Sequence, residues 1–336
     1  MIDITYARLF IFRYSNSNSR GEYSLYFSSY LKLCRENSGL TQEELVYALY
    51  AYDIDNFKCL DNSMLSKWER NFAKPKASKQ VSIIKYFQKR TGLALPFWDG
   101  YSIDDVEEML CTSGMQDLLG KSKELVLNFP SPALGTDNLH IYQIRNSKMF
   151  EQVLQINMDL DKHFNHDIPH LQSAQLKEWA MHPGNSFFIC EYHDEFFGLF
   201  FSLKLKPEAF EKIMKLEIFE SELTVDDFAS PHEIGCSHMI SFFAMNEKIA
   251  SALFIKYYAH LIRNQKMIAK VGFATMMGDA KKLMENMNFY HYANKIIGKN
   301  MELQTYHETL PNFLASENVV KMILFEGKYS EKVDEF

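Results

Sequence analysis

The chain has 336 residues, of which 47% are hydrophobic and 24% are charged, and its formal net charge at pH 7 is -7. This length suits two domains better than one, and the composition is that of a globular protein and not of a disordered chain. Because no run approaches the ~20 apolar residues that span a bilayer and the first residues lack the pattern of a signal peptide, we expect a cytoplasmic protein without a membrane partner.

The net charge is unevenly distributed along the chain. Residues 24–96 carry 11 basic and 7 acidic side chains, a balance of +4, and residues 1–23 add +1, which leaves -12 for the rest of the chain. A basic block beside an acidic body is typical of a module that binds a polyanion and is attached to a separate domain. A solvated charged face would give the same excess, so the charge alone does not decide.

Helical patterns follow one another between residues 25 and 91. Apolar residues at helical spacing predict a first helix that ends at Gly39. Thr41 and Glu44 have the spacing of a capping box, which predicts the start of a second helix. Asp61 is a suitable N-cap for a third helix, and Trp68 lies on its apolar side. A fourth helix is marked by Val81, Ile83, Ile84 and Phe87.

The run LKLCRENSGLTQEEL, followed by NSMLSKWERNFAKPKAS, resembles the Cro and lambda-repressor (XRE) family of helix-turn-helix proteins over residues 24–92. In that family the third helix enters the major groove of DNA, while the start of the second helix meets a phosphate. The resemblance implies double-stranded DNA as the partner and a homodimer on two half-sites. The residues that it implies for DNA binding are Thr41, Gln42, Asn62, Ser63, Ser66, Lys67 and Lys74.

The chemistry of these side chains suits the implied contacts. By the resemblance, Gln42 hydrogen-bonds the sugar–phosphate backbone, and Asn62, Ser63 and Lys67 approach base edges. An amide pairs with adenine and an ammonium group favours guanine. Lys74 and Lys76 would lie beside the duplex and add affinity that depends on salt.

Two features depart from the family pattern. Residues 50–60 lengthen the connection between the second and third helices, and Asn71 stands where glycine is usual. Asparagine is a mild replacement there because it tolerates positive φ better than most residues. Glu69 is expected either to pair with Arg35 or to face water, and Trp68 is expected in the core. The alternative for the whole segment is a helical interaction module that does not bind DNA.

The pattern between the two predicted domains is weaker. Residues 97–127 suggest two amphipathic helices, and residues 128–137 contain repeated structure-breaking prolines and glycine. The sequence therefore predicts four parts: an N-terminal extension (1–23), an all-α helix-turn-helix domain (24–96), a helical linker (97–137) and a second domain (138–336).

Strand-like runs alternate with helical patterns from residue 139 onward. The runs LHIYQI, SFFICEYH, FFGLFFSLKL, CSHMISFFAM, IAKVGFAT, FYHYANKII and MELQTYHETL indicate strands, the second and third of which form a hairpin around Asp194-Glu195. The runs MFEQVLQINMDL, SAQLKEWAMH, NEKIASALFIKYYAHLIRN and GDAKKLMENM indicate helices. This order predicts an α+β domain with a mixed, mostly antiparallel sheet.

The same order resembles the GNAT acetyltransferase fold over residues 139–310. The run MNEKIAS at 245–251 lies where the family has R/Q-x-x-G-x-G/A before a helix, and residues 278–289 are similar to its A-x-x-L-Y-x-x-x-G-F. In the family this helix N-terminus binds the pyrophosphate of coenzyme A. The residues that the resemblance implies for cofactor binding are Lys248, Ile249, Ala250 and Ser251.

Two hypotheses follow for this GNAT-like domain. Only Ala250 fits the glycine-rich pattern, and Met284 stands in place of the tyrosine that often acts as the general acid, which a thioether cannot replace. The sequence therefore favours a domain without catalysis or cofactor that serves dimerisation or senses a small-molecule, acyl-CoA or peptide effector. The alternative is an N-acetyltransferase that uses acetyl-CoA. Its acid or base would come from Glu217, Glu233, His238, Tyr290 or Tyr292.

No metal site is expected. His163, His166 and His170 are close in sequence, but Asp167 and Pro169 interrupt the helix that would bring them together. The five cysteines include no C-x-x-C pair, which argues against both zinc and disulfides. The predicted function is that of a sequence-specific DNA-binding transcriptional regulator.

Overall fold

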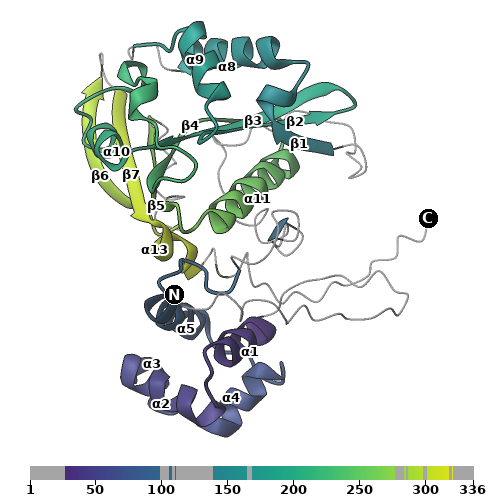
Figure 1. Ribbon diagram of the computed structural model, residues 1–336, viewed down its shortest axis with the longest axis vertical. Coiled ribbons are helices and arrows are strands. Elements are labelled where there is room, and N and C mark those ends of the chain that lie inside the picture. Colours follow the sequence, from purple (N-terminus) through teal and green to yellow (C-terminus); the bar gives the residue numbers. More distant parts are fainter. Residues whose placement is uncertain are drawn as a thin grey trace, which may run out of the picture.

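The computed structural model describes residues 27–98, 106, 107, 110, 139–164, 169–276, 284, 287–297, 301–317 and 320. These residues form a group of helices and a sheet covered by helices, which we call the helical region and the sheet domain (Figure 1). The predicted N-terminal extension, nearly all of the predicted linker and most of the predicted helix at 278–287 lie outside the described residues.

Local sequence signals place the helices of the helical region. The hydroxyl of Thr41 accepts a hydrogen bond from the Glu44 backbone N–H, and the Glu44 carboxylate accepts one from the Thr41 N–H at 2.7 Å, so the predicted capping box is confirmed. The carboxylate of Asp61 caps the next long helix by accepting from the Met64 N–H at 2.7 Å. The elements are α1 (Phe27–Asn37), α2 (Gln42–Tyr52), α3 (Ile54–Phe57), α4 (Asn62–Glu69) and α5 (Ala77–Thr91).

The longer connection between the second and third predicted helices is itself mostly helical. Residues 50–52 extend α2, and α3 follows after Asp53, whose side chain caps it. Phe57 is fully buried, so this segment contributes to the core of the helical region. The core also contains Trp68, which is 4% exposed, as predicted. Asn71, directly after α4, has the positive φ of 58° that its place in the family pattern suggests.

The sheet domain contains one seven-stranded sheet in the order β1-β2-β3-β4-β5-β7-β6. All neighbouring strands are antiparallel except β4 and β5, which confirms the predicted mixed, mostly antiparallel sheet. The turn between the second and third strands is made by His193 and Asp194, which both have positive φ. The strands are β1 (Leu139–Gln143), β2 (Ser186–Tyr192), β3 (Glu195–Leu205), β4 (Gly235–Ala244), β5 (Ile268–Thr275), β6 (Tyr290–Ile297) and β7 (Met301–Thr309).

Helices cover both faces of this sheet (Figure 1). Val153, Trp179 and Phe210 pack on one face together with Phe201, and Leu253 and Phe313 pack on the other. The helix that begins at Pro207 is not among the helices predicted from the sequence. The helices of the first face are α8 (Phe150–Phe164), α9 (Ser173–Met181) and α10 (Pro207–Met214), and those of the second are α11 (Glu247–Arg263) and α13 (Leu310–Leu314).

The two parallel strands pair over only part of their length. Their ladder ends where Met239 faces Phe273. Beyond this point β4 continues to Ala244 alongside β3, and β5 continues to Thr275 alongside β7. The sheet therefore opens between β4 and β5, at the end where α11 begins.

Two buried amides join the helical region to the sheet domain. The side chain of Gln265 accepts from the Leu95 N–H at 2.6 Å and donates to the Leu95 carbonyl at 3.1 Å. Gln88 on α5 donates to the Pro311 carbonyl on α13 at 2.7 Å. A continuous set of buried apolar residues crosses this junction. The helical region therefore contacts the sheet domain through α5, and α4 lies near the opposite end of the molecule (Figure 1).

Candidate functional site

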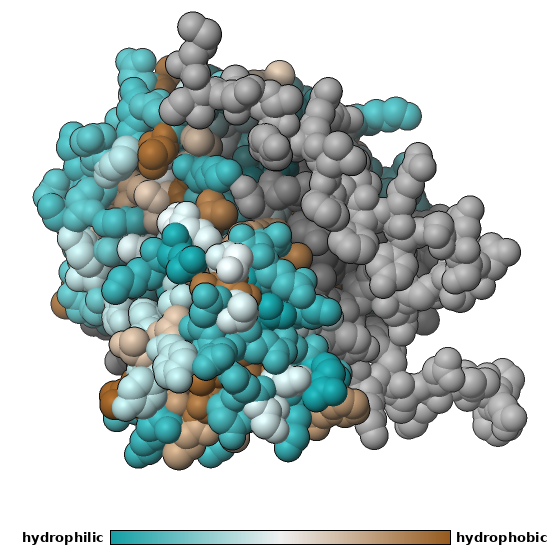
Figure 2. Space-filling model, turned by 60° about the horizontal axis from the view of Figure 1, so that its bottom comes forward, coloured by the Kyte–Doolittle hydropathy of each residue, from teal (hydrophilic) through white to brown (hydrophobic). Residues whose placement is uncertain are grey.

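Four of the residues predicted to contact DNA lie on the outer side of α4, whereas Thr41 and Gln42 lie at the start of α2 and Lys74 lies in the segment before α5. Asn62, Ser63 and Lys67 are exposed and Ser66 is half-buried, whereas Leu65 and Trp68 on the opposite side are buried. The helix thus has the predicted polar face. This end of the molecule is mainly hydrophilic, with apolar residues scattered over it (Figure 2).

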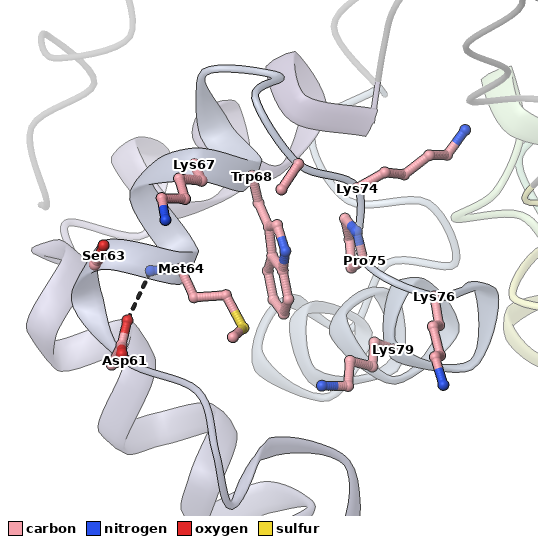
Figure 3. Close-up of a pocket in the computed structure, with 10 residues that line it drawn as sticks. Asp61, Ser63, Met64, Lys67, Trp68, Lys74, Pro75, Lys76 and Lys79 are labelled. Carbon is pink, nitrogen blue, oxygen red and sulfur yellow. Dashed lines mark hydrogen bonds between the residues drawn. The ribbon is translucent and has the colours of Figure 1, made fainter.

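An open hollow of about 490 Å³ lies between α4 and the segment that leads into α5. The Trp68 ring and Met64 form part of its wall (Figure 3). The Nζ of Lys79 lies 5.7 Å from the centre of the Trp68 ring, within the range of a cation–π contact. The carboxylate of Asp61, at the edge, is already bonded to the start of α4. The hollow is basic because four lysines line it: Lys67, Lys74, Lys76 and Lys79.

A buried ion pair connects this surface to the helical core. The Nε of Arg35 lies 2.5 Å from Glu69 Oε1. Of the two expectations for Glu69, pairing with Arg35 is therefore confirmed. Gln42 donates from its Nε2 to Glu69 Oε2 at 2.8 Å. An amide nitrogen has two hydrogens, so Gln42 keeps one for an outside acceptor. The bond to Glu69 raises the pKa of the Arg35 guanidinium and keeps it charged.

The residues predicted to bind a cofactor lie in the first turns of α11, at the opening between β4 and β5. Lys248 is half-buried, whereas Ile249, Ala250 and Ser251 are buried. Asn246 caps the helix by accepting from the Ile249 N–H at 3.0 Å. The Ala250 N–H bonds to the Asn246 carbonyl. The helix end is therefore closed by its own cap.

The charge at this helix end is mixed. Glu247 places a carboxylate in the first turn, which disfavours a bound phosphate, while Lys248 beside it favours one. The hydroxyl of Ser251 donates back to the Glu247 carbonyl at 2.8 Å. A pyrophosphate would thus have to displace the Asn246 cap to reach the Ile249 N–H.

The five proposed acid or base residues do not gather at one point. The strand registers place His238 in the same row as Gly272, His307 and Tyr290, with His238 and Tyr290 three strands, or roughly 14 Å, apart. Tyr292 donates to Glu211 at 2.6 Å, a bond that raises the pKa of the tyrosine hydroxyl. The remaining two, Glu217 and Glu233, are exposed.

Sequence reasoning missed the partner of His238. This histidine is fully buried in β4, and its Nε2 lies 2.6 Å from Oε1 of Glu220. Glu220 lies 18 positions before His238, and no spacing pattern indicates their contact. Lys79 was missed too, although the basic run KPKASK was a usable signal.

The side chains of His163 and His166 lie outside the described residues. Within the described part of the chain, no three His, Cys, Asp or Glu side chains come close enough together to hold a metal ion. The same part contains no helix that is both long and apolar enough to cross a bilayer.

No protein-family model and no curated protein matches the sequence. Solved structures that resemble it include FeeM, an N-acyl amino acid synthase from uncultured soil microbes, at 9% identity over 53% of this chain and 93% of that one, with a TM-score of 0.37. An N-acetyltransferase from Staphylococcus aureus is 13% identical over 52% of this chain and 99% of its own, with a TM-score of 0.35. A putative acetyltransferase from Salmonella typhimurium, solved with its cofactor acetyl-CoA, is 10% identical over 52% of this chain and 95% of its own, with a TM-score of 0.33.

These resemblances cover about half of this chain. At such low identities and TM-scores they establish neither a family nor an activity. The predicted resemblance of residues 24–92 to helix-turn-helix proteins receives no support from the comparisons.

Proposed function

We propose that this protein is a sequence-specific DNA-binding transcriptional regulator that binds the major groove with the polar face of α4. The observation that carries the proposal is the combination of that exposed face with the lysine-lined hollow beside it. Both lie away from the sheet domain, so a duplex can approach them (Figure 1).

The dimensions and the chemistry of α4 fit this role. An α-helix with its side chains is ~10–12 Å across, and the major groove is ~12 Å wide. Asn62 and Ser63 at the start of the helix would reach base edges first, and Lys67 would follow one turn later. Lys74 and Lys76 would then meet phosphates and supply affinity that falls with salt.

In this proposal residues 24–96 form the DNA-binding domain, and residues 138–336 set the oligomeric state or sense an effector. A homodimer would place two copies of α4 on half-sites about 34 Å apart. The buried side-chain amides of Gln88 and Gln265 support this division of roles. Their hydrogen bonds connect the helical region to the sheet domain and fix the orientation of one relative to the other.

The test is to sequence the DNA fragments that the full-length protein retains from a random pool, for wild type, Asn62→Ala and Lys67→Ala. Each variant should lose roughly 1–3 kcal/mol of discrimination at one position of the site. Lys212→Ala, which removes one exposed lysine from α10 in the sheet domain, is the matched control and should select the wild-type site. Undiminished preference in both α4 variants would reject the assignment of this helix.

The opening between β4 and β5 favours a second candidate, an N-acetyltransferase that uses acetyl-CoA. Strand edges without a neighbour can pair with the amide groups of an extended ligand, and coenzyme A contains two such groups. The helix N-terminus at the mouth of the opening, with Lys248, would face its phosphates.

Calorimetric titration of the full-length protein with acetyl-CoA separates this candidate from a domain without catalysis. A micromolar isotherm that weakens in Lys248→Ala supports the acetyltransferase. The control Lys212→Ala should leave it unchanged. A flat titration with wild type argues for effector sensing or dimerisation instead.

A further inference from the structure

The hollow beside α4 has an apolar wall as well as its lysines. More of its accessible wall is apolar than polar. The apolar residues of the wall are Met64, Trp68, Ala73 and Pro75. A phosphate of the DNA backbone has no apolar part, so contact with a duplex accounts for the lysines but not for this wall. The volume of about 490 Å³ lies within the range of ~300–1,000 Å³ that is usual for sites of small molecules.

The protein does not neutralise the positive charge of the hollow with ion pairs. Among the described residues, no carboxylate pairs with Lys67, Lys76 or Lys79. Asp61, the acidic residue of the wall, accepts a hydrogen bond from the Met64 N–H at 2.7 Å and so caps α4. Like charges that lie close together repel one another, and a bound anion removes that cost.

Lys79 places an ammonium group on a second side of the hollow. It lies on α5 and is half-buried, whereas Lys67 on α4 is exposed. The Nζ of Lys79 lies 5.7 Å from the centre of the Trp68 ring. In Figure 3 the side chains of Lys67 and Lys79 lie on either side of Met64. An anion between the two helices would therefore meet cations from both, next to apolar surface.

We infer that this hollow binds a small molecule in which an aromatic ring carries a phosphate group, and that this ligand opposes DNA binding. A phosphate ester carries about two negative charges near pH 7 and has three oxygens that accept hydrogen bonds. It can therefore bond to Lys67 and Lys79 together, while the ring lies against Met64 and Pro75. A single carboxylate would neutralise only one of the ammonium groups.

The second half of this inference rests on the proposed function. Lys67 belongs both to the hollow and to the polar face of α4. A ligand that occupies Lys67 and adds two negative charges next to that face lowers the affinity for a duplex, and DNA lowers the affinity for the ligand by the same factor. The first half concerns the hollow alone and stands whether or not α4 binds DNA.

The first experiment is an NMR titration of the full-length protein labelled at methionine methyl groups, because Met64 lines the hollow. The signal of Met64 is assigned as the one that Met64→Leu removes. The probes are 2-naphthyl phosphate, 2-naphthol and inorganic phosphate at pH 7.5. Naphthyl phosphate should shift this signal in a saturable manner, and each of the other two should bind about tenfold more weakly or worse, because it lacks either the charge or the ring.

A pair of lysine variants tests the site. Lys79→Ala removes one of the two proposed phosphate contacts and should weaken binding of naphthyl phosphate by about tenfold or more. Lys212→Ala makes the same change of charge on α10 in the sheet domain and should change the affinity less than about twofold. Methionine spectra that keep their dispersion without ligand show that both variants are folded.

The second experiment measures binding of a selected duplex with and without naphthyl phosphate. At ten times its Kd, the ligand should weaken DNA binding by about tenfold, the value for mutually exclusive binding. Sodium sulfate at equal ionic strength is the control for salt. Inorganic phosphate that binds as tightly as naphthyl phosphate, full affinity in Lys79→Ala, or DNA binding weakened no more than by sulfate would each overturn the inference. If wild type selects no DNA, the proposed function fails, and the titration alone decides the site.

Discussion

The helical region and the sheet domain place their ionisable groups differently. At α4, four lysine side chains surround an open hollow at the surface. In the sheet domain, the imidazole of His238 is fully buried and that of His260 is half-buried, and neither ring nitrogen of His307 has accessible surface or a hydrogen-bond partner among the described residues. Exposed ammonium groups stay charged at little cost and can act on a polyanion from outside. Burial lowers the pKa of His260 and of His307, so these two imidazoles are costly to charge.

The Arg35–Glu69 pair is an exception to this difference, because it is a buried pair of charged groups in the helical region. Only 13% of the Arg35 side chain and 3% of the Glu69 side chain are exposed. The pair lies between α1 and α4 and also holds Gln42 at the start of α2. Three of the helices around the proposed DNA surface are therefore fixed by one carboxylate.

The largest effect is expected from Glu69→Ala. This change leaves the Arg35 guanidinium mostly buried without its partner, which should lower the free energy of unfolding by about 3–5 kcal/mol. Urea denaturation of the full-length protein, with hydrogen exchange followed in α1 to α5, measures the loss. The matched control is Glu36→Ala, which removes an exposed carboxylate 3.4 Å from the same guanidinium and should cost less than about 1 kcal/mol. Equal losses in the two variants would show that burial does not decide the strength of the pair.

A slightly smaller effect is expected from the pH dependence of the sheet domain. Burial lowers the pKa of His260 to about 4, with a further contribution from Lys204. Above the usual histidine pKa of about 6.5, neither the folded nor the unfolded chain binds this proton. As the pH falls from there toward 4, the unfolded chain takes up the proton first, so stability drops by about 3 kcal/mol.

His260→Gln should remove this part of the pH dependence while keeping a polar group near the Ser186 hydroxyl. The measurement is urea denaturation of wild type and variant at pH 7.5 and at pH 4.5. The variant is expected to lose less stability than wild type between the two values. A loss as large as that of wild type would mean that His260 takes up its proton equally well in the folded and the unfolded protein.

The local part of the structure was predictable and the long-range part was not. The capping box of Thr41 and Glu44 and the Asp61 cap each depend on residues three apart, and the polar face of α4 follows from spacing. The seven strands were visible as alternating or apolar runs, although their order in the sheet was not predicted. These features depend on neighbours in the chain, which a single sequence displays.

The contacts that define the sites join residues distant in sequence. His238 meets Glu220 across 18 positions, Gln265 meets Leu95 across 170, and Gln88 meets Pro311 across 223. No spacing rule links such pairs, because their distance is set by strand register and by how the two parts dock. For the same reason the burial of Ile249 and Ser251 in α11 was not foreseen.

A moderate effect is expected when one surface lysine is removed. Lys76→Ala should weaken DNA binding by about 1 kcal/mol and reduce the slope of log affinity against log salt by about 0.9, the value for one phosphate contact. Binding to a selected duplex at several salt concentrations gives both quantities. Lys212→Ala makes the same change of charge in the sheet domain and should leave the slope unchanged. Equal slopes for wild type, Lys76→Ala and Lys212→Ala would mean that the DNA does not contact Lys76.

The smallest effect is expected from two substitutions that change the backbone conformational preference, one in each region. Asn71 follows α4 with a φ of 58°, and Asn288 in the sheet domain has a φ of 65°. Glycine adopts this conformation more readily than asparagine does, so Asn71→Gly and Asn288→Gly should each stabilise the protein by about 0.5 kcal/mol. Alanine at either position should cost about 1 kcal/mol. Because the effect depends on φ and not on the surroundings, urea denaturation should give similar shifts in both regions. A loss of stability in Asn71→Gly alone would mean that the side-chain amide of Asn71 makes a contact that stabilises the protein by more than the glycine backbone does. The two regions would then differ in their turns as well as in their ionisable groups.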